Sequence, residues 1–504
     1  MPGNFEIRGV PRGIALDAWW LDATIAQAGG ADGAQRGGAG PDALGAGRRR
    51  GPGTLVLVLL GDFLFWDHAV GISLAIFAMA LTGISGIGRP VKLGIRAGFV
   101  CLLGALPLAD HVQPLSLIFL AGGVIAAIVV LHAPDDDMRR LAGRAFGFVA
   151  GLPRQWLRSL APLRLPRRVA SMTGAGSPKP WARAFRDWAF PVGGSLVFLA
   201  LLMDANPVFL TLGMDYIDPW RLLQRGLLWT GIGLFAAPLL MPGLPEAQLP
   251  ALPGIRLPGL GLNPQSVLRA LVMFNLLIGI QVISDTAILF GGAALPRGMT
   301  YAEYAHRGAY PLLATAMLAG AFALLARPFR AEHRLIRPLM LLWLVQNIVL
   351  TGAAALRLDL YIDAYGLTYL RLYALVWMAL VALGLGLSIL QTALDRDTLW
   401  LAARVAALGG ATLYASAFVN FAAVIAAQNL ARPEPDLAYV CALGPMAAGA
   451  LHEAGLMDPG MPPLGLQSCA ARKPPQVEGW RDWGLRSWKV NRMLDTARLP
   501  ERAG

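Results

Sequence analysis

The residues of this sequence that could do chemistry are polar and ionisable side chains placed inside long apolar stretches. One such stretch contains Asn275, Gln281 and Asp285, and the four-residue spacing of the last two puts them on one face of a helix. Because a charged side chain costs at least about 2.5 kcal/mol at the centre of a membrane, this face is expected to point into a helix bundle. It is then either a proton or cation site or a hydrogen-bond clamp between helices. Further polar candidates of this intramembrane kind are Asp62, Asn347 and Asn420.

Four charged residues bracket the connection between two of the apolar stretches. They are Arg357, Asp359, Asp363 and Arg371. Opposite charges this close to a membrane boundary are partly desolvated, which favours pairing among them. We therefore expect a structural ion-pair network here, with a clamp for a substrate as the alternative.

A third set of residues combines carboxylates with imidazoles: Asp67, His68, Asp110, His111, Glu303 and His306. Such groups could hold a cation or act as a catalytic acid and base. However, adjacent Asp-His pairs diverge by about 100° around a helix, and the chain has no His-x-x-x-His spacing of the metal-ligand type. We therefore expect neither a metal nor a cofactor. The set would also arise simply because Lys and Arg are kept on the other side of a membrane.

The cysteines allow one cross-link. Cys101 lies inside an apolar stretch, whereas Cys441 and Cys469 lie in the polar C-terminal tail. In an oxidising compartment the two tail thiols could form a disulfide, which would add about 3 to 4 kcal/mol of stability in the chain-entropy model. The alternative is that both thiols stay free.

Several functional classes lack support in the sequence. It has no Walker loop, no dinucleotide glycine fingerprint after a strand, no Gly-x-Ser-x-Gly elbow and no Cys-x-x-Cys. Kinase, hydrolase and redox functions therefore lose their usual signals. The net charge of +12 does not indicate a nucleic-acid partner, because the arginines flank apolar stretches and are not interleaved with aromatic residues.

The elements that must position these residues are transmembrane helices. The chain is 56% hydrophobic and only 15% charged, which is too apolar for an ordinary soluble domain. In hydrocarbon only helices and closed barrels satisfy the backbone, and the apolar runs lack the strict alternation of barrel strands. We predict an all-α, polytopic transmembrane helix bundle of about eleven spans. The expected spans are 54–66, 69–88, 95–109, 114–132, 190–206, 220–241, 267–290, 309–327, 335–356, 367–391 and 399–427, the first of which is either a short span or a half-helix.

The distribution of basic residues predicts the orientation of the chain. Lys and Arg gather at 48–50, 89–96, 139–186 and 327–337, whereas the connections 110–113 and 204–219 contain none. By the positive-inside rule the basic segments are cytoplasmic and the other two connections lie outside. The scheme places the N-terminus inside and the C-terminus outside, and it fits least well at 291–308, which contains Arg297 and Arg307.

Composition also divides the chain into five parts. They are a partly disordered cytoplasmic segment (1–53), a first transmembrane group (54–132), a basic connector (133–188), a second transmembrane group (189–428) and a small extramembrane tail domain (429–504). The connector has eleven Lys or Arg against four Asp or Glu. It is either an amphipathic segment lying on anionic lipids of the inner leaflet or a flexible linker broken by prolines.

Several short segments together carry a family resemblance. They are Leu64-Phe65-Trp66-Asp67-His68, Gly71-Ile72-Ser73-Leu74, Asp204-Ala205-Asn206-Pro207, Ala364-Tyr365-Gly366-Leu367-Thr368 with Arg371, and the residues 301–308, 436–439 and 480–483. The chain resembles, over most of residues 54–500, a bacterial family of polytopic inner-membrane proteins known as domain of unknown function 4173. The resemblance implies a multi-pass location in the bacterial inner membrane and no established activity. The Gly-rich stretch 28–47 departs from that family.

These observations leave the function open between classes. We expect a non-enzymatic membrane protein, either a permease-like bundle or an envelope sensor or scaffold whose outer tail meets a periplasmic protein partner. The alternative is an intramembrane enzyme that acts on a lipid-linked or envelope substrate through the outer-face His and Asp residues. Transport requires a polar cavity around Asp285, whereas a scaffold requires that this group be bonded to its neighbours.

Overall fold

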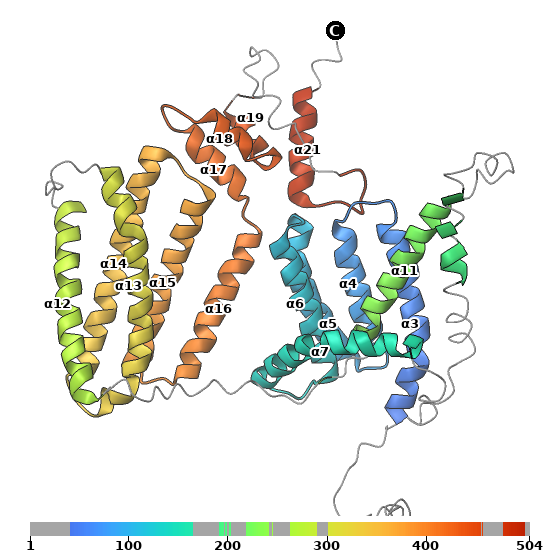
Figure 1. Cartoon of the computed structure of the whole chain (residues 1–504), viewed down its shortest axis with the longest axis horizontal. Coiled ribbons are helices and arrows are strands. Elements are labelled where there is room, and N and C mark those ends of the chain that lie inside the picture. The colour runs from blue at the N-terminus through green and yellow to red at the C-terminus, as the bar shows by residue number, and fades with distance from the viewer. Residues whose placement is uncertain are drawn as a thin grey trace, which may run out of the picture. The chain divides into compact units, whose positions relative to one another are not determined.

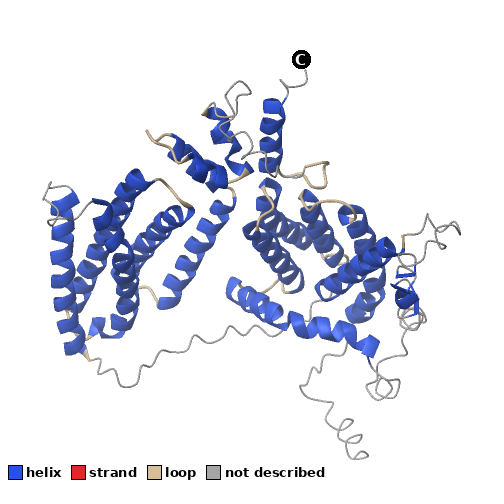
Figure 2. Cartoon of the chain, turned by 45° about the horizontal axis from the view of Figure 1, so that its top comes forward, coloured by secondary structure: helices blue, strands red, loops and turns tan. Residues whose placement is uncertain are grey.

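The computed structural model describes residues 41–164, 191–195, 197–198, 201–202, 218–240, 244, 263–289, 301–454, 456 and 477–498. Every regular element within these ranges is a helix and none is a strand, as Figure 2 shows. The chain divides into a unit of residues 1–56 and a unit of residues 57–504. All contacts given below lie within the second unit. The all-α expectation is therefore confirmed for the part of the chain that is described.

A first group of helices packs around a core of aliphatic side chains. It comprises α3 (Pro41–Phe65), α4 (Ile72–Ser85), α5 (Val91–Asp110), α6 (Pro114–His132), α7 (Met138–Arg164) and α11 (Pro219–Leu240). α4, α5 and α6 pack against one another, and α7 contacts α6 and α11. α7 runs across the end of α6 rather than along it (Figure 1) and buries Phe148 in this core.

The closest backbone approach in this group is between α5 and α6. A Cβ atom added to Gly104 would lie 2.7 Å from the Cα of Gly123 and 2.6 Å from the carbonyl oxygen of Phe119. Only glycine permits such a contact, and small residues of this kind are common where membrane helices meet. Pro114 occupies the first position of α6, where its missing N–H costs nothing, and so marks the start of this helix after a short turn.

A second group of helices packs around α14. It comprises α12 (Pro264–Leu289), α13 (Tyr301–Ala326), the 3-10 helix η2 (Arg327–Ala331), α14 (Ile336–Tyr365) and α15 (Tyr369–Ala393). α14 contacts α12, α13 and α15, and Figure 1 shows the four long helices side by side. Phe274, Phe322 and Trp343 form an aromatic cluster with ring centroids 5.3 to 6.4 Å apart. Such tilted and edge-to-face pairs fix the packing of α12, α13 and α14.

The next stretch of the chain is a broken helix. α16 (Thr398–Ala417) and α17 (Phe421–Leu430) meet at a bend of 70°. The continuous span expected at 399–427 is therefore interrupted at residues 418–420. The physical cause is Asn420, whose side chain accepts a hydrogen bond from the N–H of Ala423 at 3.2 Å and so begins a new helix.

Short helices follow α17 and form a core of their own. They are α18 (Leu437–Ala442), η3 (Pro445–Ala447), α19 (Ala448–Glu453) and α21 (Leu485–Arg498). Gly444 has a φ of 77°, a left-handed conformation that separates α18 from η3. Val440, Leu451 and Val490 are buried together with small residues of α17 and α19. This core attaches α21 to the helices that precede it.

Five described helices are long and apolar enough to cross a membrane: α5, α6, α12, α14 and α15. The bent pair α16 and α17 raises the number to six if it counts as one span. About eleven spans were expected, so the described residues account for five or six of them. α4 has only 14 residues, about 21 Å of helix, and is shorter than the predicted span 69–88. Most of the predicted span 190–206 lies outside the described residues.

Candidate functional site

The densest gathering of predicted site residues is where the C-terminal tail contacts the ends of several helices. We call it the tail-docking site. It consists of the α3–α4 turn (66–71), the α5–α6 turn (111–113), the α16–α17 break (418–420) and the tail segment 478–487. Asp67, His68, Asp110 and His111 of the predicted outer-face set lie in it or at its edge.

The tail segment caps the N-terminus of α4. The backbone N–H of Ile72 donates to the carbonyl of Trp483 at 3.0 Å, and that of Ser73 donates to the carbonyl of Arg481 at 3.1 Å. The first N–H groups of a helix have no partner in their own helix, so the tail supplies acceptors that α4 lacks. Gly71 makes this approach feasible, because a Cβ there would lie 2.3 to 2.6 Å from backbone atoms of Asp482.

His68 joins the α3–α4 turn to the tail through both of its ring nitrogens. Nδ1 contacts the carbonyl oxygen of Trp66, and Nε2 contacts Nη1 of Arg481, both at 2.5 Å. A carbonyl can only accept and a guanidinium can only donate, so Nδ1 carries the proton and Nε2 accepts. Both contacts are satisfied by the tautomer of His68 that carries its hydrogen on Nδ1.

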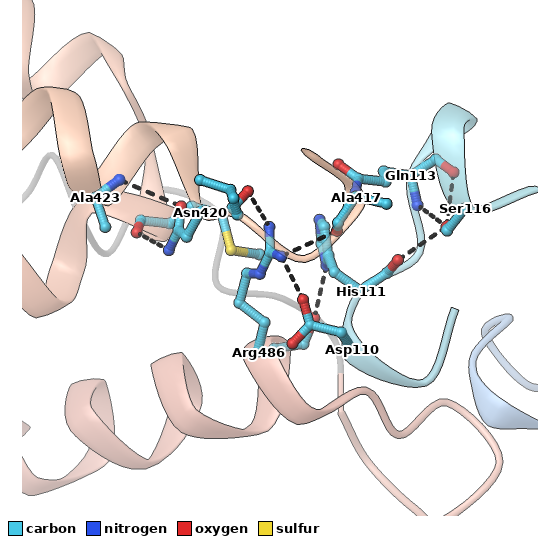
Figure 3. A network of polar contacts seen from close by, with 11 residues as sticks. Asp110, His111, Gln113, Ser116, Ala417, Asn420, Ala423 and Arg486 are labelled. Carbon is cyan, nitrogen blue, oxygen red and sulfur yellow. Dashed lines mark hydrogen bonds and ion pairs between the residues drawn. The ribbon is translucent and has the colours of Figure 1, made fainter. Parts of the chain in front are cut away.

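Arg486 connects three separate parts of the chain, as Figure 3 shows. Its guanidinium forms an ion pair with Asp110 at the end of α5. It also donates to the carbonyls of Ala417 at 3.2 Å and Val419 at 3.3 Å. These two carbonyls belong to the α16–α17 break, where the regular helix pattern is lost. Gln113 of the α5–α6 turn donates to Ala417 as well, at 2.8 Å.

His111 lies beside this ion pair in the α5–α6 turn. Its Nδ1 is 3.2 Å from the hydroxyl oxygen of Ser487, the residue after Arg486. Burial of the imidazole lowers the pKa of His111 below the usual histidine value, the charge of Arg486 lowers it further, and Asp110 raises it in part. The neutral ring is therefore the form that fits this site.

An open pocket of about 700 Å³ lies between the α3–α4 turn and the tail segment. It is lined by Phe65, Asp67, His68 and Ala69 on one side and by residues 478–482 on the other. Among its carboxylates, that of Asp482 accepts hydrogen bonds from the backbone N–H groups of Glu478 and Gly479. No group of three His, Cys, Asp or Glu that could hold a metal ion occurs among the described residues.

Asp62 is held by a partner that the sequence reasoning missed. Arg225 of α11 donates to both of its carboxylate oxygens, with Nε at 2.7 Å and Nη2 at 2.5 Å. Trp229 donates to the same carboxylate at 2.8 Å, and the Arg225 guanidinium lies over the Trp66 ring. An arginine inside a predicted span was itself a signal, because it needs a carboxylate as much as Asp62 needs a cation.

Asp285 forms an ion pair with Arg357 of α14, and both side chains are buried. Gln281 donates to the same carboxylate at 2.8 Å, which confirms that Gln281 and Asp285 share one helix face. These contacts match the clamp between helices. They also differ from the expected boundary network, because Arg357 turns toward α12 and not toward Asp359 or Asp363 of its own helix.

The remaining boundary residues hold a turn. Arg371 donates to the carbonyl of Tyr365 at 3.0 Å and to that of Gly366, while the Asp359 and Asp363 side chains are exposed. Two residues that the sequence reasoning missed complete the turn. Asn429 exchanges two hydrogen bonds with the backbone of Leu367, at 2.7 and 2.9 Å, and Arg432 donates to the carbonyl of Ala364 at 2.7 Å. These cations lie where the carbonyls at the end of α14 need donors.

The other intramembrane candidates bond mainly to nearby backbone. Asn275 donates to the carbonyls of Leu271 at 2.7 Å and Leu339 at 3.0 Å, and so links α12 to α14. Asn347 donates to the carbonyl of Trp343 at 2.7 Å within α14. Asn420 lies outside the long spans, where it donates to the carbonyl of Met446 at 2.9 Å. The structure does not bring these three amides together.

Some predicted residues fall outside what is described. The side chains of Glu303 and His306 in α13, and the whole of Cys469, belong to this category. Cys441 is disulfide-bonded and Cys101 is a free, buried thiol. The pairing of Cys441 with Cys469 stays a prediction.

Comparison with known proteins identifies a family and corrects the resemblance drawn from short segments. A family model described as Domain of unknown function (DUF4153) matches residues 97–454. The resemblance to domain of unknown function 4173 is therefore wrong; several of the segments quoted for it, at 64–74 and 480–483, lie outside the matched range. No curated protein and no solved structure matches the chain.

Proposed function

Since this chain belongs to the family described as Domain of unknown function (DUF4153), its activity has to be inferred from its own geometry. We propose that it is a non-enzymatic, multi-pass protein of the bacterial inner membrane that acts as an envelope sensor or scaffold. In this function the periplasmic tail holds the outer ends of the helices together and presents a surface to a periplasmic protein partner.

The observation that carries this proposal is the set of contacts made by Arg486. One tail side chain binds the carboxylate at the end of α5 and two carbonyls at the α16–α17 break. A tail that is bonded to helix ends from distant parts of the chain can transmit a displacement to them, whereas a merely appended domain cannot. The opening required of a permease finds less support, because Asp285 is bonded to Arg357 and Gln281 in a buried cluster.

The pattern of contacts agrees with the division of the connecting segments into two sides that the arginines predict. Segments expected outside bond to one another, as in the pairs Asp110 with Arg486 and His68 with Arg481. Segments expected inside also bond to one another: Arg327 donates to the carbonyl of Arg396, and Arg330 pairs with Asp395. Pairs between the two sets would contradict this division into two sides.

The basic connector supports a lipid partner on the cytoplasmic side. Met138, Phe146 and Val149 of α7 are exposed apolar side chains, and Arg139 and Arg140 are exposed beside them. A helix with apolar and basic exposed residues can lie in the interface of a membrane that contains anionic lipids. We propose that α7 rests on the inner leaflet in this way and that the protein binds no nucleic acid.

The alternative of an intramembrane enzyme requires an imidazole that is free to move protons near a carboxylate. His68 has both ring nitrogens engaged, by Trp66 and Arg481. The His111 ring contacts Ser487 of the tail through Nδ1. The described geometry therefore gives these two histidines positions as links between segments, which supports the non-enzymatic proposal.

A flux measurement distinguishes the proposed scaffold function from transport. The protein is reconstituted into liposomes that contain a pH-sensitive dye, and the decay of an imposed proton gradient is followed for the wild type, for Asp285→Asn and for protein-free liposomes. We expect the same decay in all three. A faster decay with the wild type that returns to the protein-free rate in Asp285→Asn would overturn the scaffold proposal and make Asp285 part of a proton path.

A further inference from the structure

The two histidines of the tail-docking site each contact the tail segment, His68 through Arg481 and His111 through Ser487. We infer that His68 and His111 make the docked tail an acid-sensitive latch, so that acidification of the outer compartment releases the tail segment from the helix ends. The inference rests on the proposed sensor function and names its signal, the proton. It concerns the same site, but the residues that titrate are His68 and His111, whereas the proposed function depends on the contacts of Arg486.

The geometry of His68 carries the first part of the argument. Nε2 must accept from Arg481, because a guanidinium has no acceptor. Protonation places a hydrogen on Nε2, which removes this hydrogen bond and sets two cations against each other. Arg481 cannot easily turn away, since its guanidinium is stacked 4.3 Å from the Phe63 ring and 5.3 Å from the Trp480 ring.

The charged groups around His68 decide the sign of the effect. Asp67 and Glu478 line the same pocket and would favour a charged ring. Asp67 already has a cation 3.6 Å away in Arg221, and Glu478 is exposed to solvent. Asp482 is occupied by two backbone N–H groups. Arg481 is the group in direct contact with the ring, so protonation weakens the link to the tail.

His111 supplies the second part of the argument. The charges that face it are Asp110 and Arg486, and these two already neutralise each other. A proton on His111 adds a second cation to a half-buried site with one carboxylate. It then competes with Arg486 for Asp110, and Arg486 is the side chain that holds the tail on the α16–α17 break.

The direction of the pH dependence follows from the lowered pKa of His111. The undocked tail leaves the ring with an ordinary pKa of about 6.5. Undocking therefore takes up protons between that value and the lower pKa of the docked state. Docking is fully stable above about pH 6.5 and loses stability as the pH falls through this window.

The N–H groups of Ile72 and Ser73 report directly on docking, because their acceptors are tail carbonyls. Hydrogen exchange of these two amides is measured in the full-length protein in lipid nanodiscs at about pH 7.5 and about pH 5.0, on either side of the histidine pKa. Rates are expressed as protection factors, which removes the intrinsic pH dependence of exchange. We expect protection at the higher pH and a several-fold loss of protection at the lower pH, in the direction that the lowered pKa of His111 sets.

The variant His68→Gln with His111→Gln should stay protected at both pH values, because a glutamine amide accepts and donates without titrating. His452→Gln, at an exposed position in α19, should lose protection at low pH as the wild type does. Equal protection of the wild type at both pH values would overturn the latch and leave the proposed function intact. Loss of protection in the double variant at low pH would assign the effect to carboxylates and overturn it too. If the two amides of the wild type are unprotected at the higher pH, the tail does not dock. This result would contradict the proposed function itself.

Discussion

At the scale of single residues, the tail is held by groups that complete bonds which the helices cannot complete themselves. The carbonyls of Arg481 and Trp483 accept from the first N–H groups of α4, which would otherwise have to bond to water or remain unsatisfied. The Arg486 side chain donates to the carbonyls of Ala417 at the end of α16 and Val419 in the α16–α17 break. Small changes at these points should therefore act on docking more than on the helices.

Gly71→Ala is the sharpest such change. The added Cβ would meet the Asp482 backbone at 2.3 to 2.6 Å, so the tail segment has to move away. Overpacking of this kind costs about 1 to 3 kcal/mol, which lowers the protection of the Ile72 and Ser73 amides by about fivefold or more. Hydrogen exchange at neutral pH measures this effect.

Gly83→Ala is the matched control in the same short helix, because a Cβ there meets no atom within 4 Å. It should leave the protection of the two amides unchanged. If the two alanine variants behave alike, the close approach of the tail to Gly71 is not what protects these amides.

Sequence reasoning at this scale found charged residues but not their partners. The spacing of Gln281 and Asp285 places them on one face, and they are hydrogen-bonded. The partner of Asp285 is Arg357, 72 positions along the chain, and no spacing rule relates residues that far apart. Arg486 is one of seven arginines in the tail 429–504, so nothing in the sequence distinguished it as the partner of Asp110.

At the scale of elements, the described helices show where the length of an apolar stretch fails to predict the bounds of a helix. The predicted spans 95–109 and 114–132 correspond to α5 and α6, because Pro90 and Pro114 mark both starts and few polar residues intervene. The predicted span 399–427 contains one amide, Asn420, that begins a new helix. An apolar average over 20 residues does not register a single capping side chain, so the bend was missed.

The α12–α14 pair offers a test of how such elements are joined. Asp285 and Arg357 are only 2% and 4% exposed, so removal of one partner leaves a charge in an apolar setting. Asp285→Ala should lower the free energy of unfolding by about 3 to 5 kcal/mol, whereas joint replacement by Leu and Met should cost far less. Denaturant unfolding of the detergent-solubilised protein measures both.

Asp359→Ala controls for a general effect of losing a carboxylate near this end of α14. Its side chain is exposed, so the change should stay within about 0.5 kcal/mol. If Asp359→Ala and Asp285→Ala lower the free energy of unfolding equally, the buried ion pair contributes no more to stability than an exposed carboxylate does.

At the scale of the whole molecule, composition sufficed for the helical class but not for the number of crossings. The excess of apolar residues predicts lipid contact, and apolar side chains such as Leu276, Ile280 and Ile283 of α12 are largely exposed. Five helices, or six with the bent pair, meet the length and composition for crossing. The short α4 and the bend at Asn420 depend on the ends of elements, which a 20-residue average does not resolve.

The two-sided distribution of contacts leads to a prediction about topology. His452 in α19 and Asp135 between α6 and α7 are both exposed, and the scheme puts them on opposite sides of the membrane. In spheroplasts, a membrane-impermeant maleimide should label His452→Cys at once, but Asp135→Cys only after the membrane is permeabilised. The parent chain provides the background, because Cys101 is buried and Cys441 is disulfide-bonded. The tail can serve as a latch for an outside signal only if it is outside. Labelling of Asp135→Cys in intact spheroplasts, with His452→Cys protected, would invert the orientation and remove the physical basis for an outer sensor.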